Sequence, residues 1–211
     1  MSTPQRPSLN TSVYSPVRFP DTLLSPKSPK ADPLGIRLKV RSIVKTVMEN
    51  HKKWELAQKR GIALCSTIEN VKKEALDRIA SEPSTTLYPD ELKTPSEKLK
   101  TITTILKDVL DSSKECLSQL NGLKKLQSNT NERLLKSWTI VKVMNAIEAI
   151  VHAYEDEYDV KVTVMENVCH SSSKEEIAFH VTVWEFETFV NDDVRFMLFG
   201  MQVECDIDGN S

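Results

Sequence analysis

The sequence is poor in the two residues that interrupt helices. Only five glycines occur in 211 residues, and seven of the ten prolines lie before residue 35. Because glycine and proline are the strongest breakers of regular structure, the middle of the chain is predicted to form long helices. So few dispersed glycines also exclude a phosphate-cradling glycine-rich loop and a G-x-S-x-G nucleophile elbow.

Cysteines and long apolar runs are scarce as well. No apolar run approaches the ~18 residues of a membrane span, and the N-terminus has no hydrophobic signal-peptide segment. The apolar fraction is 39%, and the length suits one domain or two small ones. We expect free thiols in a reducing compartment at the four scattered cysteines, which are Cys65, Cys116, Cys169 and Cys205.

The net charge of −2 conceals a strong asymmetry. Residues 1–147 carry 25 Lys/Arg and 15 Asp/Glu, a net +10, whereas residues 148–211 carry 3 and 15, a net −12. One interpretation is a pair of solvated faces that attract each other within the fold; the other is two docking surfaces for different partners. The basic half also leaves open a direct nucleic-acid binder, although its basic residues are interspersed with acidic ones.

Residues 1–34 are rich in Pro, Ser and Thr and show no hydrophobic period. Such a segment buries too little apolar surface to offset the entropy of ordering, so a disordered tail is predicted. Phosphorylation by a proline-directed kinase would reverse the sign of this mildly basic tail. The candidate phosphorylation sites, each followed by proline, are Thr3, Ser15, Ser25 and Ser28.

A hydrophobic period close to 3.5 extends from residue 36 to residue 79 and predicts one long coiled-coil helix. Asn50 and Gly61 interrupt it: the amide indicates a register device or a helix defect, and the glycine a close backbone approach or a bend. Such a helix needs a second helix, from this chain or another, to cover its apolar stripe. Its seam is Ile36, Val40, Ile43, Val47, Asn50, Trp54, Ala57, Gly61, Leu64, Ile68, Val71 and Ala75.

A second helix is predicted after a linker at 81–93. Thr94 has the features of an N-cap, Pro95 suits the first helical position, and Glu97 completes a capping box. A weaker seam continues from Leu99 to Leu134, so residues 35–136 are expected to form a helical hairpin with an exposed stripe for a partner. The candidate partner-binding residues are Trp54, Leu64, Ile68, Val71, Leu106 and Val109.

From Trp138 the composition changes, and helical spacing predicts a third helix from Thr139 to about Tyr158. Residues 160–164 and 177–183 then alternate in polarity and are rich in β-branched side chains, which favours a strand hairpin. Periodicity alone does not decide between strands and helices here.

Few residues suggest chemistry. Cys169 and His170 are adjacent, but no CxxC or HxxxH spacing accompanies them, so core or loop positions are expected. Trp138 and Trp184 are typical of core anchors, with interface hot spots as the alternative. No catalytic or metal site is predicted, and a solvated acidic face is expected at Glu155, Asp156, Glu157 and Asp159.

Two sets of residues carry a family resemblance. The first comprises residues 53–56 and 67–72, where Lys-Trp-Glu-Leu is followed by Thr-Ile-Glu-Asn-Val-Lys. Together the two sets resemble the cyclin-dependent kinase 2-interacting protein family over roughly residues 36–204, with Thr139 where that family would have a proline. The second, more specific set is Trp138, Tyr154, Glu157, Lys161, Thr163, Val164, Val168, His170, Trp184, Val190 and Arg195.

The resemblance implies a helical C-terminal region, so we expect an all-α protein. Its parts would be a disordered tail (1–34), a coiled-coil hairpin (35–136), an acidic helical module (137–204) and a disordered end (205–211). Members of the family are described as nuclear, non-enzymatic adaptors that bind cell-cycle kinases and support replication and checkpoint signalling. They are also described as subunits of an AAA-type ATPase assembly acting in replisome turnover and ribosome maturation.

The resemblance therefore implies a hetero-oligomer without a cofactor, in which a second small helical subunit is the coiled-coil partner. Contact with nucleic acid would be indirect, and no membrane would be involved.

Overall fold

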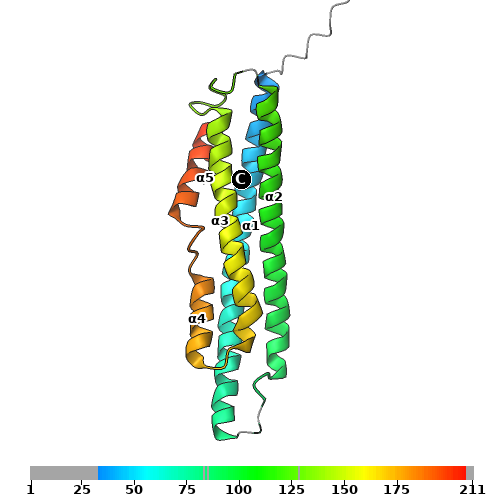
Figure 1. Ribbon diagram of the computed structural model, residues 1–211, viewed down its shortest axis with the longest axis vertical. Helices are drawn as coiled ribbons and strands as arrows, with labels where there is room; N and C mark the ends of the chain where they lie inside the picture. The colour runs from blue at the N-terminus through cyan, green and yellow to red at the C-terminus, as the bar shows by residue number, and fades with distance from the viewer. Residues whose placement is uncertain (1–32, 83, 85, 128, 208–211) are drawn as a thin grey trace, which may run out of the picture. The chain divides into compact units, whose positions relative to one another are not determined.

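A computed structural model describes residues 33–82, 84, 86–127 and 129–207, and no strand is assigned in those ranges. The described helices belong to one compact unit, residues 31–211 (Figure 1). The predicted all-α class with a long helical hairpin is confirmed. The helices are α1 (Pro33–Ser81), α2 (Lys93–Leu126), α3 (Ile140–Asn167), α4 (Lys174–Glu185) and α5 (Asp192–Cys205), with 3-10 turns at Asp90–Leu92 and Val168–His170.

The helices pack in a closed ring. Helix α1 packs on α2, α2 packs on α3, and α3 packs on both α4 and α5, which in turn contact α1. Figure 1 shows α4 and α5 following each other along the same side of the longer helices. The unit is therefore a four-helix bundle whose fourth position is shared by two short helices.

The seam of α1 is covered from within this chain. Ten of its twelve positions are buried, and only Leu64 and Val71 remain half-buried. Helices α2, α4 and α5 supply the cover, so the second helix that this stripe needs comes from this chain. The exposed stripe expected for a partner is reduced on this seam to the two half-buried positions.

Asn50 fixes the register of the hairpin. Its buried Nδ2 donates hydrogen bonds to the hydroxyls of Ser112 and Ser113 on α2, at 2.9 and 3.2 Å. Helix α1 continues through this position, so the amide is a register device rather than a helix defect. A buried amide is satisfied only where the serines lie opposite, which disfavours a shifted pairing.

The predicted ends of the second helix are wrong. Helix α2 begins at Lys93, directly after a 3-10 turn anchored by buried Leu92, so Thr94 lies inside the helix and forms no capping box. Pro95 is tolerated because the first backbone N–H groups of a helix have no intrahelical partner. The helix ends at Leu126 rather than near residue 136, and Leu134 is buried in a loop where its N–H donates to the carbonyl of Trp138.

The helical assignment implied by the resemblance is confirmed for residues 160–167 and 174–185. Helix α3 extends to Asn167, beyond its predicted end, and its N-cap is Thr139, whose hydroxyl accepts a hydrogen bond from the Lys142 N–H. Both strand-like segments are helical, and they place Val164 and Ile177 in the interior. Packing against the long helices overrides their local β-propensity.

The C-terminal helices do not form a separate module. Their buried side chains belong to the same hydrophobic core as those of α1 and α2. The predicted disordered end is also corrected in part, because Cys205 is buried and Asp206 forms ion pairs with Arg41, at 3.2 Å, and with Lys136. Residues 1–32, with the four candidate phosphorylation sites, and residues 208–211 lie outside the described residues.

Candidate interaction surfaces

Most of the predicted partner-binding residues lie inside the bundle. Trp54 and Leu106 are fully buried, and so are Ile68 and Val109 to within a few per cent. A partner helix can therefore reach Leu64 and Val71, which are half-buried, but not the other four.

Leu64 lines an apolar groove between α1 and α2. The groove has a volume of about 450 Å³, and Leu64 and Ile105 form half-buried parts of its floor. Arg60 and Lys98 give it two basic side chains, one from each helix. The complete lining is Arg60, Ala63, Leu64, Thr67, Lys98, Thr101, Ile102 and Ile105.

A second feature is the break between α4 and α5, residues 186–191, which we call the connection. At its start the fully buried ring of Trp184 fills the space beside Gly61 of α1, where an added Cβ would lie 2.3 Å from Trp184 Cζ2. Gln58, also on α1, donates a hydrogen bond from Nε2 to the carbonyl of Trp184 at 2.7 Å. Gly61 is therefore a site of close approach, but the approaching group is the Trp184 side chain rather than the backbone predicted for it.

A buried ion pair on α3 satisfies backbone groups that this break leaves open. Lys161 Nζ lies 2.8 Å from Glu157 Oε1, and both side chains are fully buried. Lys161 donates to the Trp184 carbonyl at 2.6 Å, and Glu157 Oε2 accepts the Phe189 N–H at 2.9 Å. Buried helix ends need such partners. The prediction that Glu157 belongs to a solvated acidic face is therefore wrong.

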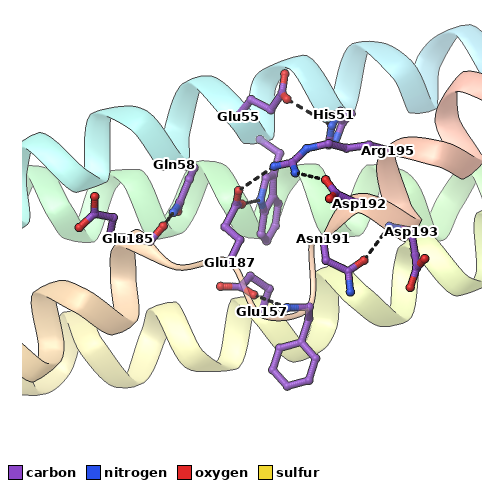
Figure 2. Close-up of polar contacts among 12 residues, drawn as sticks. His51, Glu55, Gln58, Glu157, Glu185, Glu187, Asn191, Asp192, Asp193 and Arg195 are labelled. Atoms are coloured by element: carbon purple, nitrogen blue, oxygen red, sulfur yellow. Dashed lines mark hydrogen bonds and ion pairs between the residues drawn. The ribbon is translucent and has the colours of Figure 1, made fainter.

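Aromatic and acidic side chains hold the middle of the connection. The Trp54 indole N–H donates to Glu187 Oε1 at 2.7 Å, and its ring stacks on Tyr154 with the centroids 4.5 Å apart. Figure 2 shows Arg195 between Glu187 and Asp192. The connection is thus fixed from α1, α3 and α5 rather than loosely attached.

Burial dominates the electrostatics of this region. It raises the pKa of Tyr154, and it raises the pKa of Glu187 although the Trp54 hydrogen bond opposes that change. Burial also lowers the pKa of His51, whose Nδ1 lies 2.9 Å from the Tyr154 hydroxyl, against the attraction of Glu55. These pKa shifts favour the neutral forms of the three side chains, as expected when a side chain is removed from water.

Among the resemblance residues, Tyr154, Glu157, Lys161 and Trp184 lie together around the connection. Trp138 lies elsewhere: its ring faces Gly200 of α5, and its backbone N–H donates to Glu204 Oε2 at 3.1 Å.

His170 lies at neither place: its Nδ1 is 3.3 Å from the Tyr88 hydroxyl of the α1–α2 linker. The resemblance pattern thus marks three separate structural contacts rather than one site.

Chemically reactive arrangements are not evident near Cys169. Burial raises the pKa of the Cys169 thiol, opposite to the shift that activates a nucleophile, and the neighbouring His170 contacts Tyr88 instead. Within the described ranges no three His, Cys, Asp or Glu side chains are placed to hold a metal ion. The four cysteines are free thiols, as predicted.

The feature that sequence reasoning missed is a set of exposed phenylalanines. Helix α5 buries Val194, Leu198 and Met201, yet its opposite side carries Phe196, Phe199 and Val203, which are 76%, 60% and 48% exposed. The available signal was that α5 is apolar on both sides, which is unusual for a surface helix. Three further exposed phenylalanines are Phe179 on α4 and Phe186 and Phe189 in the connection.

Some of the opposite charges of the two halves form ion pairs with each other on the surface of the bundle. Arg41 and Lys136 pair with Asp206, and Lys114 pairs with Glu155 at 2.7 Å. These pairs are exposed and contribute little stability, so attraction within the fold accounts for only part of the asymmetry.

Comparison with protein-family models and with curated proteins found no match for this chain. Among the described helices none is long and apolar enough to cross a membrane.

Proposed function

We propose that this protein is a non-enzymatic adaptor that binds a helix of another protein in the groove between α1 and α2. The observation that carries the proposal is the groove itself, because it exposes parts of Leu64 on α1 and Ile105 on α2. A third helix with an apolar stripe fits such a surface in the manner of coiled-coil packing. Arg60 and Lys98 favour a partner helix with acidic residues beside its stripe.

The cellular setting of the proposal comes from the family resemblance. In that setting the protein is a nuclear subunit linked to DNA replication, checkpoint signalling and an AAA-type ATPase assembly, with a small helical subunit as the occupant of the groove. Cell-cycle kinases would act on the Ser/Thr-Pro sites of residues 1–32.

The test adds charge to the groove without disturbing the core. Ala63 and Thr101 are exposed lining residues, so Ala63→Glu combined with Thr101→Glu should leave the bundle folded. The matched control is Ala149→Glu with Thr163→Glu on exposed positions of α3, where Thr163 makes the same bond to a carbonyl four residues earlier as Thr101 does. Tagged full-length chains would be affinity-purified from nuclear extract and their bound proteins identified by mass spectrometry.

We expect the groove variant to lose a stoichiometric partner that the control variant retains. That partner should contain an acidic amphipathic helix, and binding should be reproduced with the two purified proteins. Equal recovery of every stoichiometric partner by both variants would remove the groove from the proposal. Recovery of nucleic acid alone, released by moderate salt, would favour the nucleic-acid-binding alternative instead.

A further inference from the structure

The outer side of α5 is an apolar surface that no other described helix covers. Phe196, Phe199 and Val203 recur at helical spacing and lie opposite the buried Val194 and Leu198. A helix that is apolar all round is normally covered on both sides. Exposed phenylalanines side by side on one helix are a feature of interaction sites rather than of an ordinary surface.

Exposed acidic side chains border one end of this surface. Asp192 and Asp193 lie in the first turn of α5. Arg195, which is also exposed, is held by Asp192 at 2.8 Å and lies 3.9 Å from Glu187. Asp193 and Glu185 are exposed on either side of the connection. An occupant of this surface must therefore offer apolar side chains together with positive charge.

Charge decides between the classes of occupant. An anionic membrane would be repelled by this acidic surface. Two copies pairing through the same α5 surface would bring like charges together, which opposes association. A basic partner is attracted by Glu185, Asp192 and Asp193. The groove between α1 and α5, of about 230 Å³, gives room for one of its apolar side chains beside Leu198 and Phe199; Lys52, Glu55 and Arg195 also line this groove.

We propose that the outer side of α5, with Phe196 and Phe199 at its centre, binds a basic amphipathic helix of a partner protein. The 14 residues of α5 offer a contact about 21 Å long, which suits a partner helix of similar length. The binding surface is already ordered, because Arg195, Glu187 and the buried Glu157 fix the segment from the connection into α5. This surface and the α1–α2 groove have opposite charge, so one adaptor would hold an acidic helix and a basic helix at separate places.

The experiment uses two synthetic 18-residue peptides as probes. Both carry the same leucine stripe at helical spacing, and the remaining positions are all lysine in one and all glutamate in the other. Binding to the full-length chain is measured by fluorescence anisotropy at physiological salt. The variants are Phe196→Ser with Phe199→Ser, and Glu185→Gln with Asp193→Asn. The matched control is Leu38→Ser with Leu56→Ser, which removes exposed apolar side chains from α1.

We expect the lysine peptide to bind and the glutamate peptide to bind at least tenfold more weakly. The phenylalanine variant should weaken lysine-peptide binding at least tenfold, and the acidic variant several-fold, whereas the leucine control should match the natural sequence. Circular dichroism melts should coincide for all chains, since every substituted side chain is exposed.

Two binding results would overturn the proposal. One is lysine-peptide binding that survives the loss of both phenylalanines, and the other is equal binding of the two peptides. The proposal also fails if the natural chain forms a dimer that the phenylalanine variant does not, or if it binds phosphatidylserine vesicles through these phenylalanines. The Ala63→Glu, Thr101→Glu chain distinguishes the two surfaces. It should bind the lysine peptide as tightly as the natural chain does, so this inference and the groove proposal can fail independently.

Discussion

At the scale of single residues, Gly61 leaves no room for a side chain. Trp184 fills the space that a side chain at Gly61 would need, and its ring is fully buried. Gly61→Ala should therefore lower the free energy of unfolding by about 1–3 kcal/mol, the usual cost of overpacking a core. Gly122 is the control: it lies in α2 with nothing within 4 Å of an added Cβ, so Gly122→Ala should raise the free energy of unfolding by about 0.5–1 kcal/mol. Urea denaturation followed by circular dichroism measures both, and a change of the same sign in the two variants would contradict the packing account.

Gly61 also shows what residue patterns reveal and what they do not. A glycine at a seam position predicts a close approach, but it does not identify the tryptophan, far along the chain, that makes the approach. The burial of Glu157 and Lys161 was harder still to predict, because an acid followed by a lysine four residues later is an ordinary surface pair on a helix. Their burial depends on the break between α4 and α5, whose open backbone groups they satisfy.

At the scale of elements, the break in the fourth helix depends on that buried pair. Lys161→Met should lower the free energy of unfolding by about 3–5 kcal/mol, because Glu157 would be left charged, buried and without its cation. The control is Lys73→Met, which removes the lysine of the more exposed pair with Glu69 at the same spacing and should cost no more than about 1 kcal/mol. Hydrogen exchange at the Phe189 amide, which donates its hydrogen bond to Glu157, should accelerate only in the Lys161 variant. Similar costs for the two lysines would show that the pair does not hold the connection.

The elements themselves were predictable to different degrees. The long helices followed from sustained hydrophobic periods, and the Thr139 cap falls where the third helix was expected to start. The start of α2 was not predictable from capping signals, since a 3-10 turn anchored by Leu92 leads directly into it. Residues 160–164 and 177–183 have a local strand pattern that only tertiary packing overrides. Apolar residues on both sides of α5 were visible in the sequence, but which side faces the core is known only from the burial of Val194 and Leu198.

At the scale of the whole molecule, the hairpin was expected to be an independent arm and is instead half of a shared core. Trp54 stacks on Tyr154 of α3, and the ring of Trp184 of α4 packs against Gly61. The buried face of α1 is therefore fully covered only when the C-terminal helices are present. The same arrangement explains why a charged residue at Ile68, which a seam position suggests as a way to disrupt a partner, would disrupt the fold instead: its side chain is fully buried.

A chain that ends at residue 136 tests this interdependence. Without α3, α4 and α5, the apolar seams of α1 and α2 lose much of their cover, and each buried aromatic or leucine side chain represents about 1.5–3 kcal/mol of lost burial. We expect the shortened chain to self-associate or to lose helicity, as measured by light scattering coupled to size exclusion and by circular dichroism. Co-expression with residues 137–211 should restore a one-to-one complex with the helicity of the intact protein. A shortened chain that remains a monomer and unfolds cooperatively would show that the hairpin folds alone, and it would reopen the α1 seam as a surface for a partner helix.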